Sequence, residues 1–421
     1  MPTLPKSGIA PDEVLAAMMD ARGEDADWRR GRLWSLVYHG GAEHTGTLHR
    51  AYELFSAENG LSPKAFPSLA RFEAEIIGML AGLLGDAGAR GSMTSCGSES
   101  IMLAVKAYRD HARVAKPRIW RPEMLVPSSA HPAFFKAAEY LDVVARPIPV
   151  GPDYRAVAGA MADAVNGDTI LLVGSAPSFP QGVVDPIDEL GRIALDRGVG
   201  LHVDACLGTF MLAFLDRIGR SAPRFDFRVP GVTSVSADLH KYGYAAKGAS
   251  AVLYREPKLL RSQVFVYKDW PGGHFSSPGV TGTRPGGIIA AAYAALLTLG
   301  TDGYTRLARE AMELTGTLLR GIRGIPGLHV LGKPDMSVFA FAADGYDIYA
   351  VADALEKKGW HMDRQNNPNS LHMIVTPHHG QAVGAFLEDL RAATARARQR
   401  PPDESSRRAV LYGITDDAGT G

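Results

Sequence analysis

The segment Val232-Thr-Ser-Val-Ser-Ala-Asp-Leu-His-Lys-Tyr-Gly-Tyr-Ala-Ala-Lys-Gly248 joins a strand pattern to a cluster of reactive side chains. Alternating β-branched and small residues predict a short strand, which places His240, Lys241 and Tyr242 at its end. Open α/β sheets bind ligands beyond the carboxyl ends of their strands, so Lys241 is expected to enter a crevice. Partial desolvation there would remove some of its charge and leave an amine that attacks aldehydes.

A buried amine of this kind suits a Schiff base with pyridoxal 5'-phosphate. The competing interpretation is that Lys241 and Lys247 are two surface lysines on a hairpin loop, because short motifs often match by chance. The choice between the two depends on which other groups the chain supplies at the same edge of the sheet.

The composition is that of a globular protein without an excess of charge. The 421 residues include 45 basic and 45 acidic side chains, and 46% are hydrophobic. Nucleic acid is therefore not expected as a partner. Two cysteines are too few for a disulfide framework, so we expect a cytoplasmic protein. No apolar run reaches the ~18 residues of a membrane span and the N-terminus lacks a signal-peptide pattern, so no stable membrane anchor is expected.

Short apolar strands alternate with helices between residues 92 and 255, which predicts an α/β fold with a mostly parallel sheet covered by helices on both faces. The expected strands are 124–127, 143–147, 169–174, 200–204, 234–237 and 249–254. The expected helices between them are 99–115, 131–140, 154–164 and 185–197. A long helical stretch over 288–323 then leads to a smaller α+β unit.

This pattern divides the chain into three parts. We expect an N-terminal arm and helix over residues 1–60, a large cofactor-binding domain over 61–290, and a small C-terminal α+β domain with a disordered tail over 291–421. Residues 27–41 form a turn-rich arm with two tryptophans and three arginines, and a partner subunit is the expected surface for it.

Three further groups are expected at the edge of the sheet that carries Lys241. The segment Thr94-Ser-Cys-Gly-Ser-Glu-Ser100 opens a helix, where free amides and hydroxyls would bind a phosphate, unless Ser98 only caps the helix. Asp204 ends another strand, where its carboxylate would keep a pyridine nitrogen protonated or merely cap a turn. His131 begins a helix, where it would stack on an aromatic ring or act as a structural cap.

Six segments carry a family resemblance: Thr94-Ser-Cys-Gly-Ser-Glu-Ser, Lys106-Ala-Tyr-Arg-Asp110, His131-Pro-Ala-Phe, His202-Val-Asp-Ala-Cys-Leu-Gly208, residues 225–248, and Gly282-Thr-Arg-Pro-Gly286. Together they resemble the sphingosine-1-phosphate lyase family, a branch of the pyridoxal-phosphate-dependent decarboxylases with the aspartate-aminotransferase fold. The resemblance runs from about residue 28 to residue 412. It implies fold type I, with a seven-stranded type of sheet in the large domain.

The resemblance also implies a role for each matching residue. Lys241 would form the Schiff base, Asp204 would pair with the pyridinium and His131 would stack on the ring. Other contacts to the cofactor would come from Cys96, Gly97, Ser98, Cys206, Ser236 and His240. In a homodimer with shared active sites, the neighbouring subunit would contribute Gly282 and Thr283. The residues implied in substrate binding or proton transfer are Tyr38, Asn59, Tyr242, Lys247, Arg284 and Tyr412. No metal ligands are expected.

The reaction implied by the resemblance is retro-aldol cleavage of a phosphorylated long-chain amino alcohol to a fatty aldehyde and phosphoethanolamine. The general base would be His131, Tyr242, Lys247 or the cofactor phosphate, and the sequence does not choose among them. Two positions depart from the family. Ser62 replaces a histidine that helps to hold the substrate phosphate, and Cys96 replaces a glycine.

The replacement of histidine by Ser62 indicates a second possible function, that of an amino-acid decarboxylase or another lyase that acts on a non-phosphorylated substrate. A cofactor-free binding protein is a further alternative. Gly327-Leu-His-Val-Leu-Gly-Lys333 resembles a nucleotide-binding loop, but Pro334 stands where such a loop needs a metal-binding hydroxyl.

Overall fold

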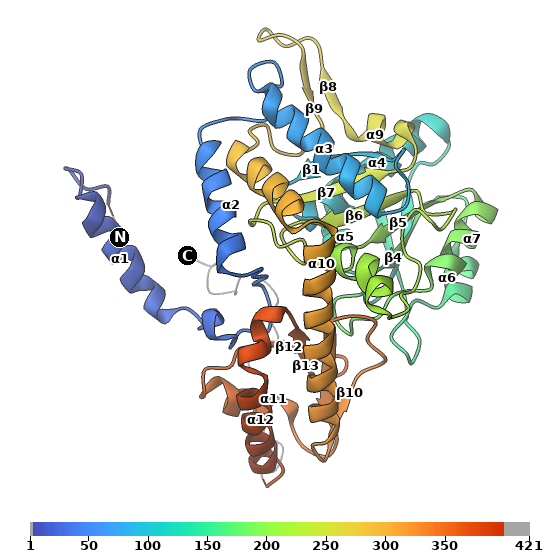
Figure 1. Ribbon diagram of the computed structural model, residues 1–421. Coiled ribbons are helices and arrows are strands. Elements are labelled where there is room, and N and C mark those ends of the chain that lie inside the picture. Colours follow the sequence, from blue (N-terminus) through green and yellow to red (C-terminus); the bar gives the residue numbers. More distant parts are fainter. Residues whose placement is uncertain (1–2, 400–421) are drawn as a thin grey trace.

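A seven-stranded sheet forms the centre of the larger part of the molecule in the computed structural model, which describes residues 3–399 (Figure 1). Its strands pair in parallel, except that β7 runs antiparallel to both of its neighbours. In spatial order they are β1 (Arg90–Thr94), β7 (Ser250–Tyr254), β6 (Ser234–Asp238), β5 (Gly200–Asp204), β4 (Thr169–Ser175), β2 (Glu123–Pro127) and β3 (Val144–Ile148). The predicted mostly parallel α/β sheet is confirmed.

The central strands are apolar at nearly every position because helices cover both faces of the sheet. Successive side chains of β7 point to opposite faces. Val252 and Tyr254 pack with helices α4 and α5, whereas Ala251 and Leu253 pack with α3, α8 and α10. The helices of this part are α2 (Ala42–Leu54), α3 (Pro67–Leu83), α4 (Gly97–Ala115), α5 (Ala133–Leu141), α6 (Ala158–Ala164), α7 (Ile187–Arg197), α8 (Thr209–Leu215), α9 (Pro257–Gln263) and α10 (Gly286–Arg323).

A second hydrophobic core lies under a four-stranded antiparallel sheet at the lower end of Figure 1. The strands are β10 (Leu328–Val330), β11 (Val338–Ala343), β13 (Ser370–Ile374) and β12 (Asp363–Gln365), in that spatial order. Helices α11 (Ile348–Glu356) and α12 (Val383–Ala397) cover this sheet. We refer to this unit as the small domain.

Helix α10 connects the two cores. Its residues up to Met312 belong to the core of the large sheet, and those from Leu318 onward belong to the small domain. By length and composition alone, α10 is apolar enough to cross a membrane. It packs instead against α2, α3, α8 and α12, so in this structure it serves as a core helix that spans both parts.

The N-terminal arm packs on its own chain, which corrects the expectation that residues 27–41 need a partner subunit. Trp34 is fully buried against His379, Trp360 and Phe386 of the small domain. Helix α1 (Pro11–Ala21), which precedes the arm, has no buried residue and projects away from the rest of the molecule (Figure 1).

Several short strands are absent from the sequence prediction. β1 and β12 were missed because Arg-Gly-Ser-Met-Thr and Asp-Arg-Gln lack a clear alternation of apolar and polar residues. A hairpin of β8 (Phe265–Tyr267) and β9 (Phe275–Ser277) was also missed, and it projects from the upper end of the molecule (Figure 1).

Candidate active site

A cavity of about 220 Å³ lies at the carboxyl ends of β5 and β6, beside the N-terminus of α4. All but two of its lining residues are ones that the sequence singled out; the exceptions are Ile101 and Asp238. The lining consists of Cys96, Gly97, Ser98, Ile101, His131, Asp204, Cys206, Asp238, His240 and Lys241. The strand ends therefore converge as the sequence predicts.

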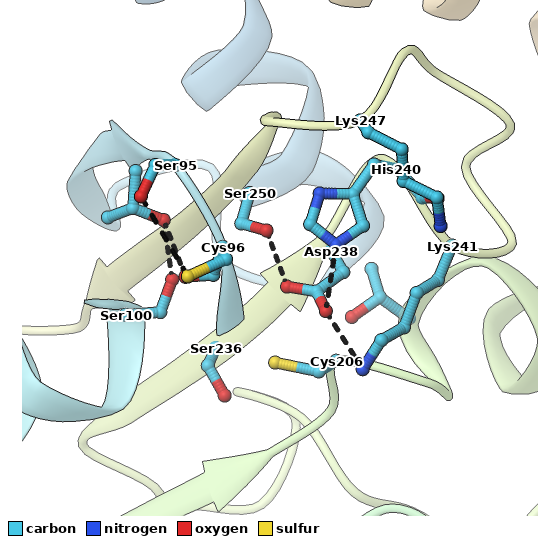
Figure 2. A network of polar contacts seen from close by, with 12 residues as sticks. Ser95, Cys96, Ser100, Cys206, Ser236, Asp238, His240, Lys241, Lys247 and Ser250 are labelled. Atoms are coloured by element: carbon cyan, nitrogen blue, oxygen red, sulfur yellow. Dashed lines mark hydrogen bonds and ion pairs between the residues drawn. The ribbon is translucent and has the colours of Figure 1, made fainter. Parts of the chain in front are cut away.

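The amine of Lys241 forms an ion pair with Asp238, with 3.0 Å between Nζ and Oδ2 (Figure 2). Burial alone would lower the pKa of Lys241, but the nearby Asp238, with smaller contributions that include Asp204, raises it well above its usual value. The expectation that desolvation removes charge from Lys241 is therefore wrong for this structure. The carboxylate outweighs the burial, because an opposite charge within a few ångströms favours the charged amine.

Asp238 is held in place from its other side as well. It is the last residue of β6 and its side chain is 1% exposed. Its Oδ1 accepts a 2.6 Å hydrogen bond from the hydroxyl of Ser250 on β7. Figure 2 shows Asp238 between Ser250 and Lys241. We call Lys241 and Asp238, together with Ser250 that supports them from behind the lining, the floor of the cavity.

Asp204 faces the same cavity from the end of β5. Its Oδ1 accepts hydrogen bonds of 3.1 Å from the backbone N–H of Cys206 and from the hydroxyl of Ser236. These two donors fix the carboxylate in one orientation. Because the carboxylate of Asp204 is anchored and lines the cavity, it is placed to accept a hydrogen bond from a protonated ring nitrogen.

The N-terminus of α4 presents its first turn to the cavity through Gly97 and Ser98. Cys96 is the N-cap residue and makes no side-chain cap, and Ser98 lies inside the helix, so the alternative of ordinary capping by Ser98 is wrong. Glu99 instead accepts two hydrogen bonds of 2.7 Å from the N–H and the hydroxyl of Ser95. The sequence did not predict these two hydrogen bonds, which fix the loop that precedes the helix.

Two histidines in the cavity are neutral near pH 7. Burial lowers the pKa of His240 to about 4, and burial also lowers the pKa of His131. The Nδ1 atom of His131 accepts the backbone N–H of Ala133 at 3.1 Å. Among the described residues, Nδ1 of His240 is buried without a hydrogen-bond partner. A neutral His240 can therefore offer one ring N–H to a ligand.

Tyr38 and Lys247 are not part of the cavity lining but lie near Lys241, and we call this pair the rim of the cavity. The Nζ atom of Lys247 lies 4.9 Å from the centre of the Tyr38 ring and 3.4 Å from the carbonyl oxygen of His240. Crowding around the amine and the charge of Lys241 lower the pKa of Lys247 to about 8. The amine end is the partly buried part of this residue; the residue as a whole is exposed in the single chain, and water there moderates the shift.

Tyr242 lies outside the cavity lining, although it directly follows Lys241. Its hydroxyl donates to the carbonyl oxygen of Val375 at 3.0 Å and accepts from the hydroxyl of Ser337 at 2.8 Å. Burial raises the pKa of Tyr242 well above its usual value. The structure therefore ties this tyrosine to the small domain, and its ring supports Tyr38 through an edge contact at 5.0 Å.

Four further predicted residues within the described part of the chain do not line the cavity: Asn59, Gly282, Thr283 and Arg284. Asn59 holds the loop before α10, because its Oδ1 accepts the backbone N–H of Arg284 at 3.0 Å. Arg284 itself forms an ion pair with Glu73. Gly282 and Thr283 are exposed on the same loop. Tyr412 lies outside the described residues.

The residues of the cavity fit pyridoxal 5'-phosphate. A lysine, an anchored carboxylate and a neutral imidazole surround one space, and a helix N-terminus beside it suits a phosphate. Gly97 keeps that space open. A Cβ atom at this position would lie 2.8 Å from Sγ of Cys206 and 3.1 Å from both carboxylate oxygens of Asp238. Nδ1 of His240, which has no hydrogen-bond partner in the described part of the chain, could also form a hydrogen bond with a bound phosphate.

Comparison with known proteins gives the same picture. The pyridoxal-dependent decarboxylase conserved domain matches residues 53–344. The chain is similar to the sphingosine-1-phosphate lyase of Oryza sativa subsp. japonica, with 43% identity over 97% of this chain and 77% of that protein. It is also similar to the enzyme of the same name from Dictyostelium discoideum, with 45% identity over 92% of this chain and 73% of that protein.

Among solved structures, the sphingosine-1-phosphate lyase of Burkholderia pseudomallei aligns with a TM-score of 0.92 and 41% identity, covering 95% of this chain and 94% of that one. The glutamate decarboxylase of Lactobacillus brevis aligns with a TM-score of 0.82 at 20% identity over 95% of this chain and 96% of that one. The second likeness shows the fold alone. The predicted fold type I architecture is confirmed.

Proposed function

This chain belongs to the sphingosine-1-phosphate lyase family, and on that premise we propose that it cleaves a carbon–carbon bond in a phosphorylated long-chain amino alcohol. The products are a fatty aldehyde and phosphoethanolamine, and the cofactor is pyridoxal 5'-phosphate. The observation that carries the proposal is the cavity in which Lys241, Asp204 and His131 meet beside the N-terminus of α4. The cofactor-free binding protein is not favoured, because such a protein has no need of this combination.

Six residues of the cavity lining have a defined task in this reaction. Lys241 would hold the cofactor covalently, and Asp204 would hold the proton of its ring nitrogen, because two donors fix that carboxylate. The neutral ring of His131 would stack on the cofactor. The phosphate would take the amides of Gly97 and Ser98 and the ring N–H of His240. When bound, the cofactor supplies an electron-accepting ring for the electron pair released on cleavage.

We assign the proton transfer from the substrate hydroxyl to Lys247. Tyr242 is engaged with the small domain, and burial gives His131 a low pKa that makes it a weak base. The pKa of Lys247 is lowered toward the neutral range, where a general base is most effective. The Tyr38 ring beside the amine would limit the directions from which a substrate approaches it.

A homodimer with shared sites completes the proposal. Helix α1 has no buried residue, and the β8–β9 hairpin exposes Phe265, Tyr267 and Trp270. Exposed apolar surfaces of this kind are typical of protein interfaces. Gly282 and Thr283 do not line the cavity of their own chain, which leaves them free to serve a partner's site. Analytical ultracentrifugation would measure the mass of the assembly, and a monomer at micromolar concentration would contradict this part.

Ser62 bears on whether the substrate is phosphorylated. It is exposed in the turn that follows α2, where its N–H donates to the carbonyl oxygen of Asn59. The family resemblance places a phosphate-binding histidine at this position. The relatives named as sphingosine-1-phosphate lyases nevertheless favour the lyase over the amino-acid decarboxylase, since the decarboxylase structures share only the fold.

Product analysis tests the proposal directly. Purified protein loaded with cofactor would be incubated with sphingosine 1-phosphate or with unphosphorylated sphingosine, and the products identified by mass spectrometry. We expect a long-chain aldehyde and phosphoethanolamine from the phosphorylated substrate only. The Lys241→Ala variant is the matched inactive control. Release of carbon dioxide from an amino acid, without any aldehyde from either amino alcohol, would refute the proposed reaction in favour of the decarboxylase.

A further inference from the structure

Asp238 is the one charged residue in the cavity lining to which the proposed reaction gives no task. It is nearly inaccessible to solvent, yet it carries a carboxylate at the centre of the cavity floor. One oxygen contacts the Lys241 amine at 3.0 Å and the other accepts the Ser250 hydroxyl at 2.6 Å. A buried carboxylate is costly unless a cation and hydrogen bonds compensate it, so Lys241 and Ser250 are what allow Asp238 to stay ionised.

The other groups around this pair do not replace Lys241 as its counter-ion. His240 approaches Oδ2 at 3.7 Å, but its pKa of about 4 leaves it uncharged near pH 7. From the loop after β5, Cys206 is a buried thiol whose pKa is raised well above the usual value by burial. The remaining titratable groups that face the pair are Asp204 from β5, His131 from the start of α5, Tyr38 from the arm and Lys247 from the rim.

We propose that Asp238 is a positioning residue that holds Lys241 as a docked ammonium in the cofactor-free chain, so that release of this ion pair controls cofactor loading. The inference rests on the proposed cofactor, but it does not depend on the substrate. Loading joins the Lys241 nitrogen to the aldehyde carbon and expels the aldehyde oxygen as water. An ammonium has no lone pair for this bond, so one proton must first pass to solvent. The ion pair opposes that loss.

The carboxylate of Asp238 also borders the space that Gly97 leaves open in the cavity. The space that a Cβ at Gly97 would fill is bounded by both oxygens of Asp238 and by Cys206. A ligand bound beside the N-terminus of α4 would therefore lie next to the ion pair of Lys241 and Asp238, which lines the same cavity.

The test measures cofactor uptake by the cofactor-free full-length chain, followed by visible absorbance, as a function of pH. Asp238→Asn keeps the size of the side chain and its bond to Ser250 but removes the charge. Without the carboxylate, the buried amine loses its proton more readily, and we expect the pH midpoint of uptake to fall by about one unit or more. Uptake at neutral pH should be correspondingly faster, by about tenfold per unit. Ser250→Ala, which keeps the charge, is the matched control and should move the midpoint much less.

A second measurement covers the case in which Asp238→Asn fails to fold. Brief reductive methylation of the cofactor-free wild-type chain, read by mass spectrometry, compares Lys241 with Lys258, which lies in a surface ion pair with Glu256. We expect Lys241 to stay unmodified until a distinctly higher pH than Lys258. Equal labelling of the two lysines, or an unchanged uptake midpoint in a folded Asp238→Asn variant, would overturn the inference. Neither readout uses the lyase substrate, so a wrong substrate assignment would leave both intact.

Discussion

The floor and the rim of the cavity each hold a lysine, and the two amines differ in electrostatic surroundings although one loop carries both. At the floor, Lys241 lies against the buried carboxylate of Asp238, which raises its pKa. At the rim, Lys247 lies over the Tyr38 ring, and no acidic side chain within residues 3–399 forms an ion pair with it; burial together with the charge of Lys241 lowers its pKa. The surroundings of Lys241 favour its cation, whereas those of Lys247 lower its pKa to about 8 and so make its neutral form accessible just above pH 7. Proximity in the sequence therefore says little about protonation, which depends on the burial of each amine and on the charges around it.

The largest expected effect comes from removing the floor lysine. Lys241→Ala should abolish turnover, a loss of at least about 10⁴-fold, because the accelerations that enzymes achieve depend on the group that holds the reacting molecule. The variant should also lack the visible absorbance of covalently held cofactor. Absorbance spectra and product assays of the purified variant check both outcomes. A variant that kept the absorbance and turned over would show that the floor lysine is not the attachment point.

The second effect tests the rim. Lys247→Arg keeps the positive charge and the contact with Tyr38, but a guanidinium does not lose its proton in this pH range. We expect turnover to fall by about 10²- to 10³-fold while the cofactor absorbance stays normal. Lys258→Arg, at the surface, should behave like the wild type.

The pH dependence sharpens the same comparison. If the neutral amine of Lys247 is the active form, the wild-type rate rises with pH through the pKa of Lys247, which burial lowers to about 8. The arginine variant should lack this rise, since it has no neutral form to gain. A rise that persists unchanged in Lys247→Arg would move the base to another group and remove the functional contrast between floor and rim.

The sequence predicts which residues meet at the cavity, because the carboxyl ends of parallel strands converge at one edge. Asp204, His131 and Lys241 were found in this way, each at a strand end or just after one. The partner of Lys241 was not predicted, although Asp238 stands three residues before it in the same motif. Whether that side chain points into the cavity depends on the register of β6 with β7, which places Asp238 opposite Ser250.

Tertiary packing also decides where two other predicted groups lie. Tyr242 follows Lys241 directly and was one of the candidates for the general base. Its hydroxyl is hydrogen-bonded to Val375 and Ser337 of the small domain, which are distant in the sequence. Likewise, the aromatic arm was expected to need a partner subunit, whereas Trp34 fills the core of its own small domain. Local sequence gives the residue type and its element, but it does not say which distant segment receives the side chain.

The smallest of the three expected effects concerns the joint between the rim and the small domain. Tyr242→Phe removes the hydroxyl that donates to Val375 and accepts from Ser337 in a fully buried position. Leaving buried polar groups unpaired typically costs about 1 to 3 kcal/mol, so we expect a loss of stability of that order in urea unfolding of the cofactor-loaded protein. The cofactor absorbance should be unchanged, and turnover should fall only a few-fold through the support that the ring gives Tyr38. Ser337→Ala, which removes the other hydroxyl of the joint, is the matched variant, and its loss of stability should not add fully to that of Tyr242→Phe because the two groups share one bond. If turnover fell as much as in Lys247→Arg without any loss of stability, Tyr242 would instead take part in the reaction itself.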